Sequence, residues 1–136
     1  MRKISKHVQI EGPIEHKKDD SKIQVGIDIE RVVRFRDFKY PEKMFTEKEL
    51  EYFQKFADKA VHMAGTFCAK EAVSKAIKKG LGKEVGVQDI EILHDEYGAP
   101  YVNDINGKLE PILGPNDLDI SIAHSDEIAV STCILY

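Results

Sequence analysis

The sequence of 136 residues has no tryptophan and only two cysteines, Cys68 and Cys133, which lie far apart in apolar segments. So few cysteines exclude a disulfide scaffold, and free thiols are typical of a reducing compartment. No apolar run approaches the roughly 20 residues that a helix needs to cross a bilayer. The first residues also lack the apolar stretch of a secretory signal. These absences predict a small, soluble, cytoplasmic protein without a membrane partner.

An excess of basic charge is also absent. The chain has 20 Lys and Arg against 24 Asp and Glu, which gives a formal net charge of −4, and 42% of its residues are hydrophobic. This hydrophobic share is enough for one core in a chain of ordinary domain length. Because general nucleic-acid binders carry a basic surplus, the acidic balance argues against nucleic acid as a partner.

The order of apolar patterns predicts a single α+β domain over residues 23–136, with a charged arm over residues 1–22 before it. Alternating β-branched residues over 23–30 indicate a strand. Gly26 inside that strand suggests a close approach of another backbone or a bulge.

Helical patterns follow the first strand. Thr46 begins T-E-K-E, a capping box that predicts a helix over residues 46–56. Residues 59–79 form the longest helical candidate, which ends before Gly80 and is apolar on more than one side, as buried helices are. Further strands are expected over residues 87–93, 100–102, 119–124 and 127–135. The expected architecture is an antiparallel sheet packed on a long buried helix.

Glu71 stands out within the buried helix, because the only other formal charges between residues 60 and 77 are Lys70 and Lys75. A buried carboxylate is costly unless it is paired or binds a metal. Glu71 and Lys75 are four residues apart in the favourable order, so a helix-surface ion pair is one interpretation. A metal ligand is the other.

Two carboxylates lie on one side of the first strand, since Asp28 and Glu30 are two residues apart. Like charges on a half-buried face repel unless a cation lies between them. A hard cation with oxygen ligands, Mg²⁺ before Ca²⁺, suits this arrangement. The alternative is that Asp28 caps a turn and Glu30 is solvated at the end of the strand.

His124 lies in S-I-A-H-S-D at the end of an apolar strand, where a lone histidine is more often structural than catalytic. Nothing else in the sequence supports a serine hydrolase, because no nucleophile-elbow motif accompanies it. Between residues 31 and 43, five basic residues outnumber Asp37 and Glu42. Such a run is either a solvated face or a surface that attracts an acidic macromolecule. The five are Arg31, Arg34, Arg36, Lys39 and Lys43.

Five stretches together resemble the holo-[acyl-carrier-protein] synthases, the short 4'-phosphopantetheinyl transferases, and occur in that family's order. They are GIDIERVVR (26–34), MFTEKELEYF (44–53), AGTFCAKEAVSKAI (64–77), VQDIEILHDEYGAPYV (87–102) and SIAHSDEIA (121–129). The resemblance implies transfer of the phosphopantetheine arm of coenzyme A to a serine of an acyl carrier protein. The reaction would depend on Mg²⁺ and release adenosine 3',5'-bisphosphate, in fatty acid or polyketide synthesis.

The resemblance also implies roles for individual residues. The implied catalytic set is Asp28, Glu71, Lys75 and His124. Of these, Asp28 and Glu71 match the Mg²⁺ ligands, and Glu30 is a candidate third ligand. Lys75 matches the lysine that contacts the phosphates, and His124 matches a histidine near the pyrophosphate and nucleotide end. Lys70 and Ser74 join Lys75 and His124 in the implied coenzyme A site, and Arg31, Arg34 and Arg36 form the implied carrier-protein surface.

Two positions depart from the family pattern. Thr66 stands where many members carry an arginine, so one basic contact to the nucleotide is missing or is supplied elsewhere. Glu30 stands where short members often have an uncharged residue. Members of this length form homotrimers, and by analogy with double-length relatives His124 would face Asp28 and Glu71 from a neighbouring subunit. The alternative function is a non-catalytic module of the same fold that binds an acidic partner.

Overall fold

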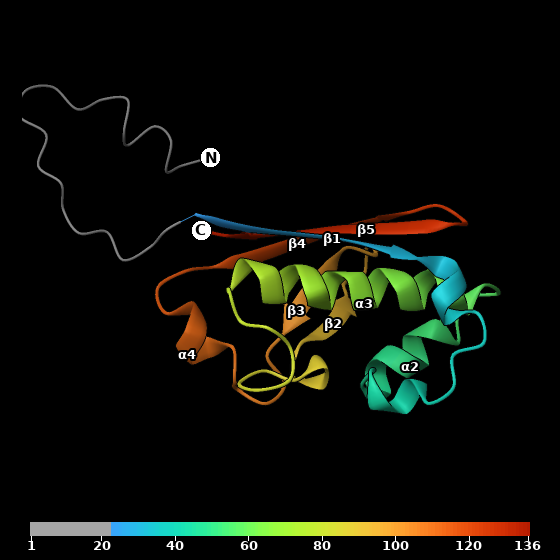
Figure 1. The fold of residues 1–136 in the computed structure, drawn as a ribbon, viewed down its shortest axis with the longest axis horizontal. Helices are drawn as coiled ribbons and strands as arrows, with labels where there is room; N and C mark the ends of the chain where they lie inside the picture. Colours follow the sequence, from blue (N-terminus) through green and yellow to red (C-terminus); the bar gives the residue numbers. More distant parts are fainter. Residues whose placement is uncertain (1–22) are drawn as a thin grey trace, which may run out of the picture.

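The computed structural model describes residues 23–136, and the arm predicted over residues 1–22 lies outside this range. Three antiparallel strands, seen edge-on in Figure 1, form the main sheet, and their pairing gives the order β1-β5-β4. Their bounds are Gln24–Arg31 for β1, Leu118–His124 for β4 and Ile128–Leu135 for β5. A separate hairpin pairs β2 (Glu91–His94) with β3 (Pro100–Asn103).

The helix α3 (Lys59–Ala76) runs beneath the main sheet, and the β2–β3 hairpin and the short helices lie on its other side (Figure 1). These are α2 (Glu47–Phe53), α4 (Glu110–Leu113) and the 3₁₀ turns η1 (Val32–Phe35), η2 (Pro41–Lys43) and η3 (Val87–Asp89). The predicted architecture, an antiparallel sheet on a buried helix, is confirmed. No helix within residues 23–136 has the length and apolar character needed to span a membrane.

Gly26 brings α3 against β1, as its position in the strand predicted. A Cβ added to Gly26 would lie 1.9 Å from the carbonyl oxygen of Ala72 and 2.7 Å from the amide nitrogen of Ala76. No side chain fits into that space, so only glycine allows the helix to cross the strand at this depth. The crossing holds the residues beside Ala72 directly over β1.

The capping box at the start of α2 is also confirmed. The Glu49 amide donates to Thr46 Oγ1 at 3.3 Å, and the Thr46 amide donates to Glu49 Oε1 at 2.8 Å. Both predicted helices are shorter than expected: α2 ends at Phe53, and α3 ends at Ala76. Lys78 follows α3 with φ of 61°, a left-handed conformation that stops the helix before its last predicted turn.

Two clusters of buried apolar side chains surround α3, one toward β2, β4 and β5 and the other toward η1 and α2. The outer face of the main sheet is different. Val25, Ile27 and Ile29 of β1 are 56%, 58% and 62% exposed. The polar residues of β1 therefore face α3, and its apolar residues face outward.

Candidate active site

Asp28 and Glu30 project from β1 toward α3, on the face where Gly26 brings the helix close. The sequence expectation that these two carboxylates share one side of the strand is confirmed. Glu71 and Lys75 belong to the turns of α3 that border this face, one turn apart. We call Asp28, Glu30, Glu71 and Lys75 the carboxylate cluster.

Lys75 binds Asp28 and does not form the helix-surface pair with Glu71 that was one interpretation of the sequence. Its Nζ donates to Asp28 Oδ1 and to the carbonyl oxygen of Ile27, both at 3.0 Å. The Asp28 hydrogen bond raises the pKa of Lys75, whose side chain is 52% exposed. The ammonium therefore stays charged at neutral pH and is accessible to a ligand.

The positive charges near the carboxylates of the cluster do not fully compensate their negative charges. Asp28 Oδ2 is buried and has no hydrogen-bond partner within the described residues. Burial, followed by contact with the Asp28 side chain, raises the pKa of Glu30 to about 7, although Arg34 donates to its Oε1 at 2.8 Å. Burial and then the charge of Asp28 also raise the pKa of Glu71. A cation among these oxygens would relieve the repulsion.

The chemistry of these donors fits a hard divalent cation. Residues 23–136 contain no ready-made group of three or more His, Cys, Asp or Glu that could hold a metal. Mg²⁺ does not need one, because it keeps several waters and is usually bound through one or two carboxylates plus substrate phosphates. Asp28 and Glu71 are the residues that would hold it, with Glu30 beside them.

The structure places Lys70 elsewhere. Its Nζ lies 2.7 Å from Glu49 Oε1, and both side chains are fully buried. It also donates to the carbonyl oxygen of Val87 at 2.8 Å. The side chain is enclosed in the core between α3 and α2, so it does not reach a ligand at the surface. Ser74 is buried too, and donates to the Glu71 carbonyl oxygen at 2.7 Å.

The arginines expected to bind a partner lie at the end of β1 and in the segment after it. Arg34 stacks over the Phe67 ring, 4.7 Å from its centre, while it binds Glu30. Arg36 pairs with Asp58 at 2.6 Å. Arg31, Arg34 and Arg36 are all exposed, so their charges face solvent on one side of the carboxylate cluster.

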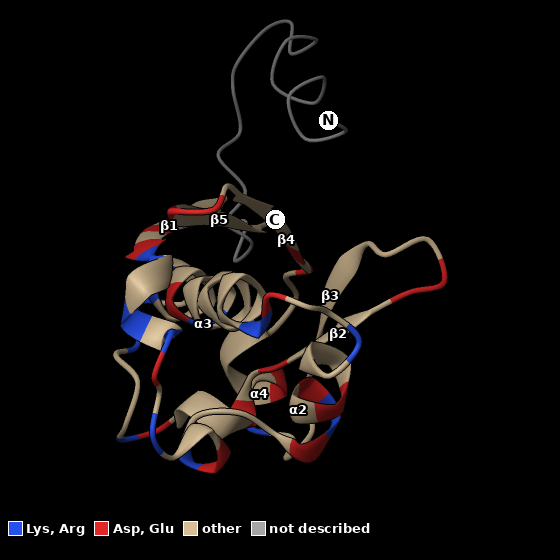
Figure 2. Cartoon of the chain, turned by 90° about the vertical axis from the view of Figure 1, so that its right-hand side faces the viewer, with Lys and Arg blue, Asp and Glu red and all other residues tan. Residues whose placement is uncertain are grey.

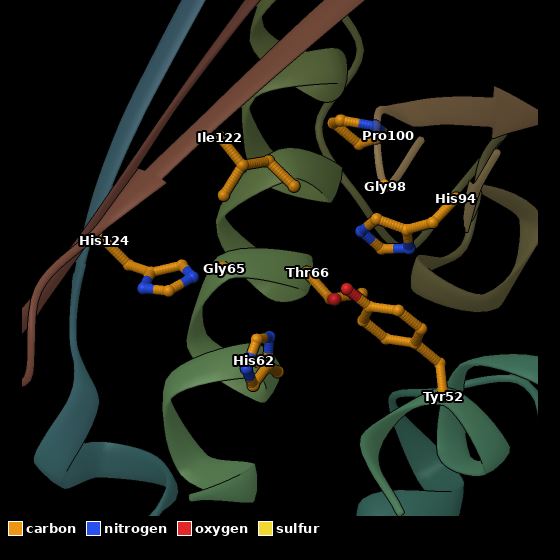
Figure 3. A pocket seen from close by; sticks show the side chains of 9 residues that line it. All are labelled: Tyr52, His62, Gly65, Thr66, His94, Gly98, Pro100, Ile122 and His124. Carbon is orange, nitrogen blue, oxygen red and sulfur yellow. The ribbon is translucent and has the colours of Figure 1, made fainter. Parts of the chain in front are cut away.

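His124 belongs to β4, the edge strand of the main sheet on the far side of β5 from β1 (Figure 2). It borders a cavity of about 120 Å³. The residues around this cavity, which Figure 3 shows from close by, are Tyr52, His62, Gly65, Thr66, His94, Gly98, Pro100, Ile122 and His124. Gly65 lets β4 pack closely on α3 at the cavity wall, because a Cβ there would meet Ile122 at 3.1 Å.

Sequence reasoning missed three members of this cavity: Tyr52, His62 and His94. They come from three different elements, α2, α3 and β2. Tyr52 and His94 lie in stretches that carry the family resemblance, but no pattern in the sequence shows that they meet His62 in space. Thr66, which was singled out as a departure from the family pattern, lies in the cavity wall and is buried.

Comparisons with known proteins agree with one another. The sequence profile of the 4'-phosphopantetheinyl transferase superfamily matches residues 24–133. The holo-[acyl-carrier-protein] synthase of Finegoldia magna is 39% identical over 118 residues, which cover 84% of this chain and 96% of the relative.

Solved structures give the same result. The holo-(acyl-carrier-protein) synthase of Bacillus anthracis, in complex with CoA (3',5'-ADP), superimposes with a TM-score of 0.71 and 34% identity over 82% of this chain and 94% of that one. The Helicobacter pylori enzyme in complex with coenzyme A has a TM-score of 0.72 and 28% identity, covering 82% and 99%. The resemblance stated from the sequence is confirmed. The chain belongs to the 4'-phosphopantetheinyl transferase superfamily and is an enzyme of this class.

Proposed function

We propose that this chain transfers the 4'-phosphopantetheine arm of coenzyme A to a serine hydroxyl of an apo-acyl carrier protein. The reaction uses Mg²⁺, releases adenosine 3',5'-bisphosphate and serves fatty acid or polyketide synthesis in the cytoplasm. The observation that supports this most is the carboxylate cluster, where Asp28 has a buried oxygen without a partner beside Glu30 and Glu71. The holo-[acyl-carrier-protein] synthase of Finegoldia magna is 39% identical over 84% of this chain.

Asp28 and Glu71 are the proposed Mg²⁺ ligands. A Mg²⁺ ion held by these residues would supply positive charge that stabilises the negative charge developing on the phosphates during transfer. Glu30 supplies a further negative oxygen, and Arg34 holds that carboxylate in place.

Lys75 is the proposed phosphate contact. It is anchored by Asp28 and by the Ile27 carbonyl oxygen, and half of its side chain is exposed. An ammonium with three donors can keep these two hydrogen bonds and direct the third toward a phosphate oxygen. It is therefore positioned before the substrate arrives.

The cavity beside His124 is the proposed place for the nucleotide end of coenzyme A. A nucleotide base is flat and apolar on its faces, which suits walls built from Ile122, Pro100 and Tyr52. Within one chain, however, the cavity borders β4 while the carboxylate cluster borders β1, with β5 between them. We propose that one molecule of coenzyme A uses both, with the cavity of one copy adjoining the carboxylates of another.

We therefore include a homotrimer in the proposal, with each active site shared between two subunits. The exposed apolar row on the outer face of β1 supports assembly, because contiguous exposed apolar residues often mark interfaces. The row consists of Val25, Ile27 and Ile29, and exposed Val33 and Ile128 lie close to its end.

The acidic surface of a carrier protein is the proposed partner of Arg31, Arg34 and Arg36. Arg34 and Arg36 already have acidic partners on this chain, which orient their side chains without burying them. Complementary charge of this kind raises the association rate more than the final affinity. Removing the charges of Arg31 and Arg36 should weaken recognition of the carrier protein and leave coenzyme A binding unchanged.

The test is incubation with coenzyme A, Mg²⁺ and an apo-acyl carrier protein, followed by mass spectrometry of the carrier. Wild type should add the phosphopantetheine mass. Asp28→Asn and Glu71→Gln should abolish the addition while circular dichroism stays unchanged. Glu84→Gln, a matched change in the exposed loop after α3, should retain activity. If no member of a carrier-protein panel gains mass, the chain is a non-catalytic binding module instead.

The shared site has its own test. Asp28→Asn and His124→Ala variants are each expected to be inactive. If carboxylates and cavity come from different subunits, unfolding and refolding the two variants together should restore part of the activity. No recovery in mixed trimers would show that each chain carries a complete site.

A further inference from the structure

The cavity beside His124 has an unusual set of ionisable groups. Among the described residues that line it, none is Lys, Arg, Asp or Glu, and the groups that titrate are three imidazoles and the phenol of Tyr52. The imidazoles come from His62 on α3, His94 on β2 and His124 on β4. Figure 3 shows them arranged around the stretch of α3 that contains Gly65.

Aromatic packing fixes the two imidazoles that the proposed reaction does not yet use. The His62 ring stacks on Phe56 with centres 3.5 Å apart, and its edge meets the His124 ring at 5.2 Å. The His94 ring stacks on Tyr52 at 3.9 Å, nearly parallel to it. Nδ1 of His94 is buried and has no hydrogen-bond partner within the described residues. Both rings are therefore held in place at the cavity wall, and one of their nitrogen atoms has an unused hydrogen-bonding capacity.

Burial and neighbouring charges lower the pKa of both rings. Burial, and then the charge of His124, lowers the pKa of His62, with Asp58 opposing. Burial, followed by His62 and Lys55, lowers the pKa of His94, with Asp95 opposing.

The carboxylates that oppose these shifts lie outside the cavity lining. Asp58 is bound to Arg36, and Asp95 accepts hydrogen bonds from the backbone of its own turn. Neither charge enters the cavity, so the imidazoles have no anion there to balance them.

We propose that His62 and His94 bind a phosphate group at the nucleotide end of coenzyme A, and that they take up protons as it binds. This inference rests on the proposed function, which brings the nucleotide to this cavity. Thr66 stands where the family pattern has an arginine, so a basic contact to the nucleotide is absent at that position. On this proposal the two imidazoles replace it, because they gain positive charge as the ligand binds.

The physical reason is linkage. A phosphate inside the cavity favours the protonated form of each ring, since an opposite charge close by outweighs burial. Two protonated imidazoles would repel each other in the empty cavity, but a dianion between them removes that penalty. Ligand binding and proton uptake are then coupled, and affinity rises as pH falls from 8 toward 6.

Calorimetric titration of the full chain with adenosine 3',5'-bisphosphate tests this. EDTA is included so that the carboxylate cluster holds no metal. Titrations at pH 6 and pH 8, in buffers of different ionisation enthalpy, give the affinity and the number of protons exchanged. Phe preserves the stacking of both rings, so the test variant is His62→Phe/His94→Phe. It should bind about tenfold more weakly at pH 6 and take up fewer protons than wild type.

Two controls make the result decisive. The phosphates of the ligand titrate in this range themselves, but they do so equally with wild type and variant, so the difference belongs to the histidines. Lys83→Gln, which removes a cation from the exposed loop after α3, should leave affinity and proton uptake unchanged. Equal affinity and equal proton uptake in wild type and double variant would overturn the proposal.

A measurement on wild type alone covers the case in which the double variant fails to fold. Nuclear magnetic resonance of the imidazole C–H groups, with and without adenosine 3',5'-bisphosphate, should show the pKa of His62 and His94 rising when the ligand binds. Unchanged titration curves would contradict the inference. Failure of the proposed function looks different, because wild type would then add no phosphopantetheine at any pH. With only the histidine inference wrong, transfer persists and the variant keeps the wild-type Michaelis constant for coenzyme A.

Discussion

Replacing Lys70 with methionine separates a structural role from a ligand-binding one. Lys70 Nζ and Glu49 Oε1 lie 2.7 Å apart with both side chains fully buried. Removing one partner of a buried ion pair costs about 3–5 kcal/mol, because the other charge is left in the core. Glu49 keeps hydrogen bonds from the amides of Thr46 and Ile92. We therefore expect the lower end, a loss of about 3 kcal/mol in the free energy of unfolding.

Urea unfolding followed by circular dichroism measures this loss, with Lys48→Met as the matched control. Lys48 is exposed on α2, so its replacement should change stability by less than about 0.5 kcal/mol. At a temperature where Lys70→Met is still folded, its Michaelis constant for coenzyme A should equal that of wild type. A stable variant with a raised Michaelis constant would refute the structural role and restore the contact with coenzyme A that the sequence suggested.

Three further changes test the geometry. Gly26→Ala should lower the free energy of unfolding by at least about 1–3 kcal/mol, because its Cβ would overlap the Ala72 carbonyl oxygen; an unchanged urea midpoint would disprove the close crossing. In metal-free wild type the pKa of Glu30 is about 7 against an ordinary value of 4.5, so the folded state binds the proton more tightly and stability falls as pH rises through that window. Glu30→Gln should lack this decline in urea unfolding between pH 5 and pH 8, and parallel profiles would count against it. Ile27→Lys should convert the proposed trimer to monomer in light scattering, since Ile27 is 58% exposed on the outer sheet face, whereas a persistent trimer would place the interface elsewhere.

Local signals in the sequence were enough for much of the fold. The capping box at Thr46, the alternation of the first strand and the two final strands depend on neighbouring residues, and all are found in the structure. The close approach at Gly26 was also predictable, because a glycine inside a β-branched strand commonly marks a bulge or a site where another backbone comes near. Helix ends were less predictable. The helix α3 stops where Lys78 adopts a left-handed conformation, which a lysine rarely adopts and which its residue type therefore does not predict.

The candidate site could be predicted only where residues lie on one element or in a known motif. Asp28 and Glu30 share a strand face, so their proximity followed from periodicity. Which way that face points depends on packing against α3, which the strand's own sequence does not encode. The partner of Lys70 is Glu49, 21 residues away, and the imidazoles of the cavity lie still further apart. Contacts of this kind arise from tertiary packing.

The positions of the carboxylate cluster and the cavity on opposite edges of the β1-β5-β4 sheet restrict the symmetry of any assembly that unites them. A two-fold axis through β1 would set like against like, carboxylates beside carboxylates, and leave both cavities outside. Only a heterologous, head-to-tail contact joins unlike edges, and such contacts close into rings when their rotation is a whole fraction of a turn. In a closed ring, each copy places its carboxylate-bearing edge against one neighbour and its cavity-bearing edge against the other. No edge is then left without a partner.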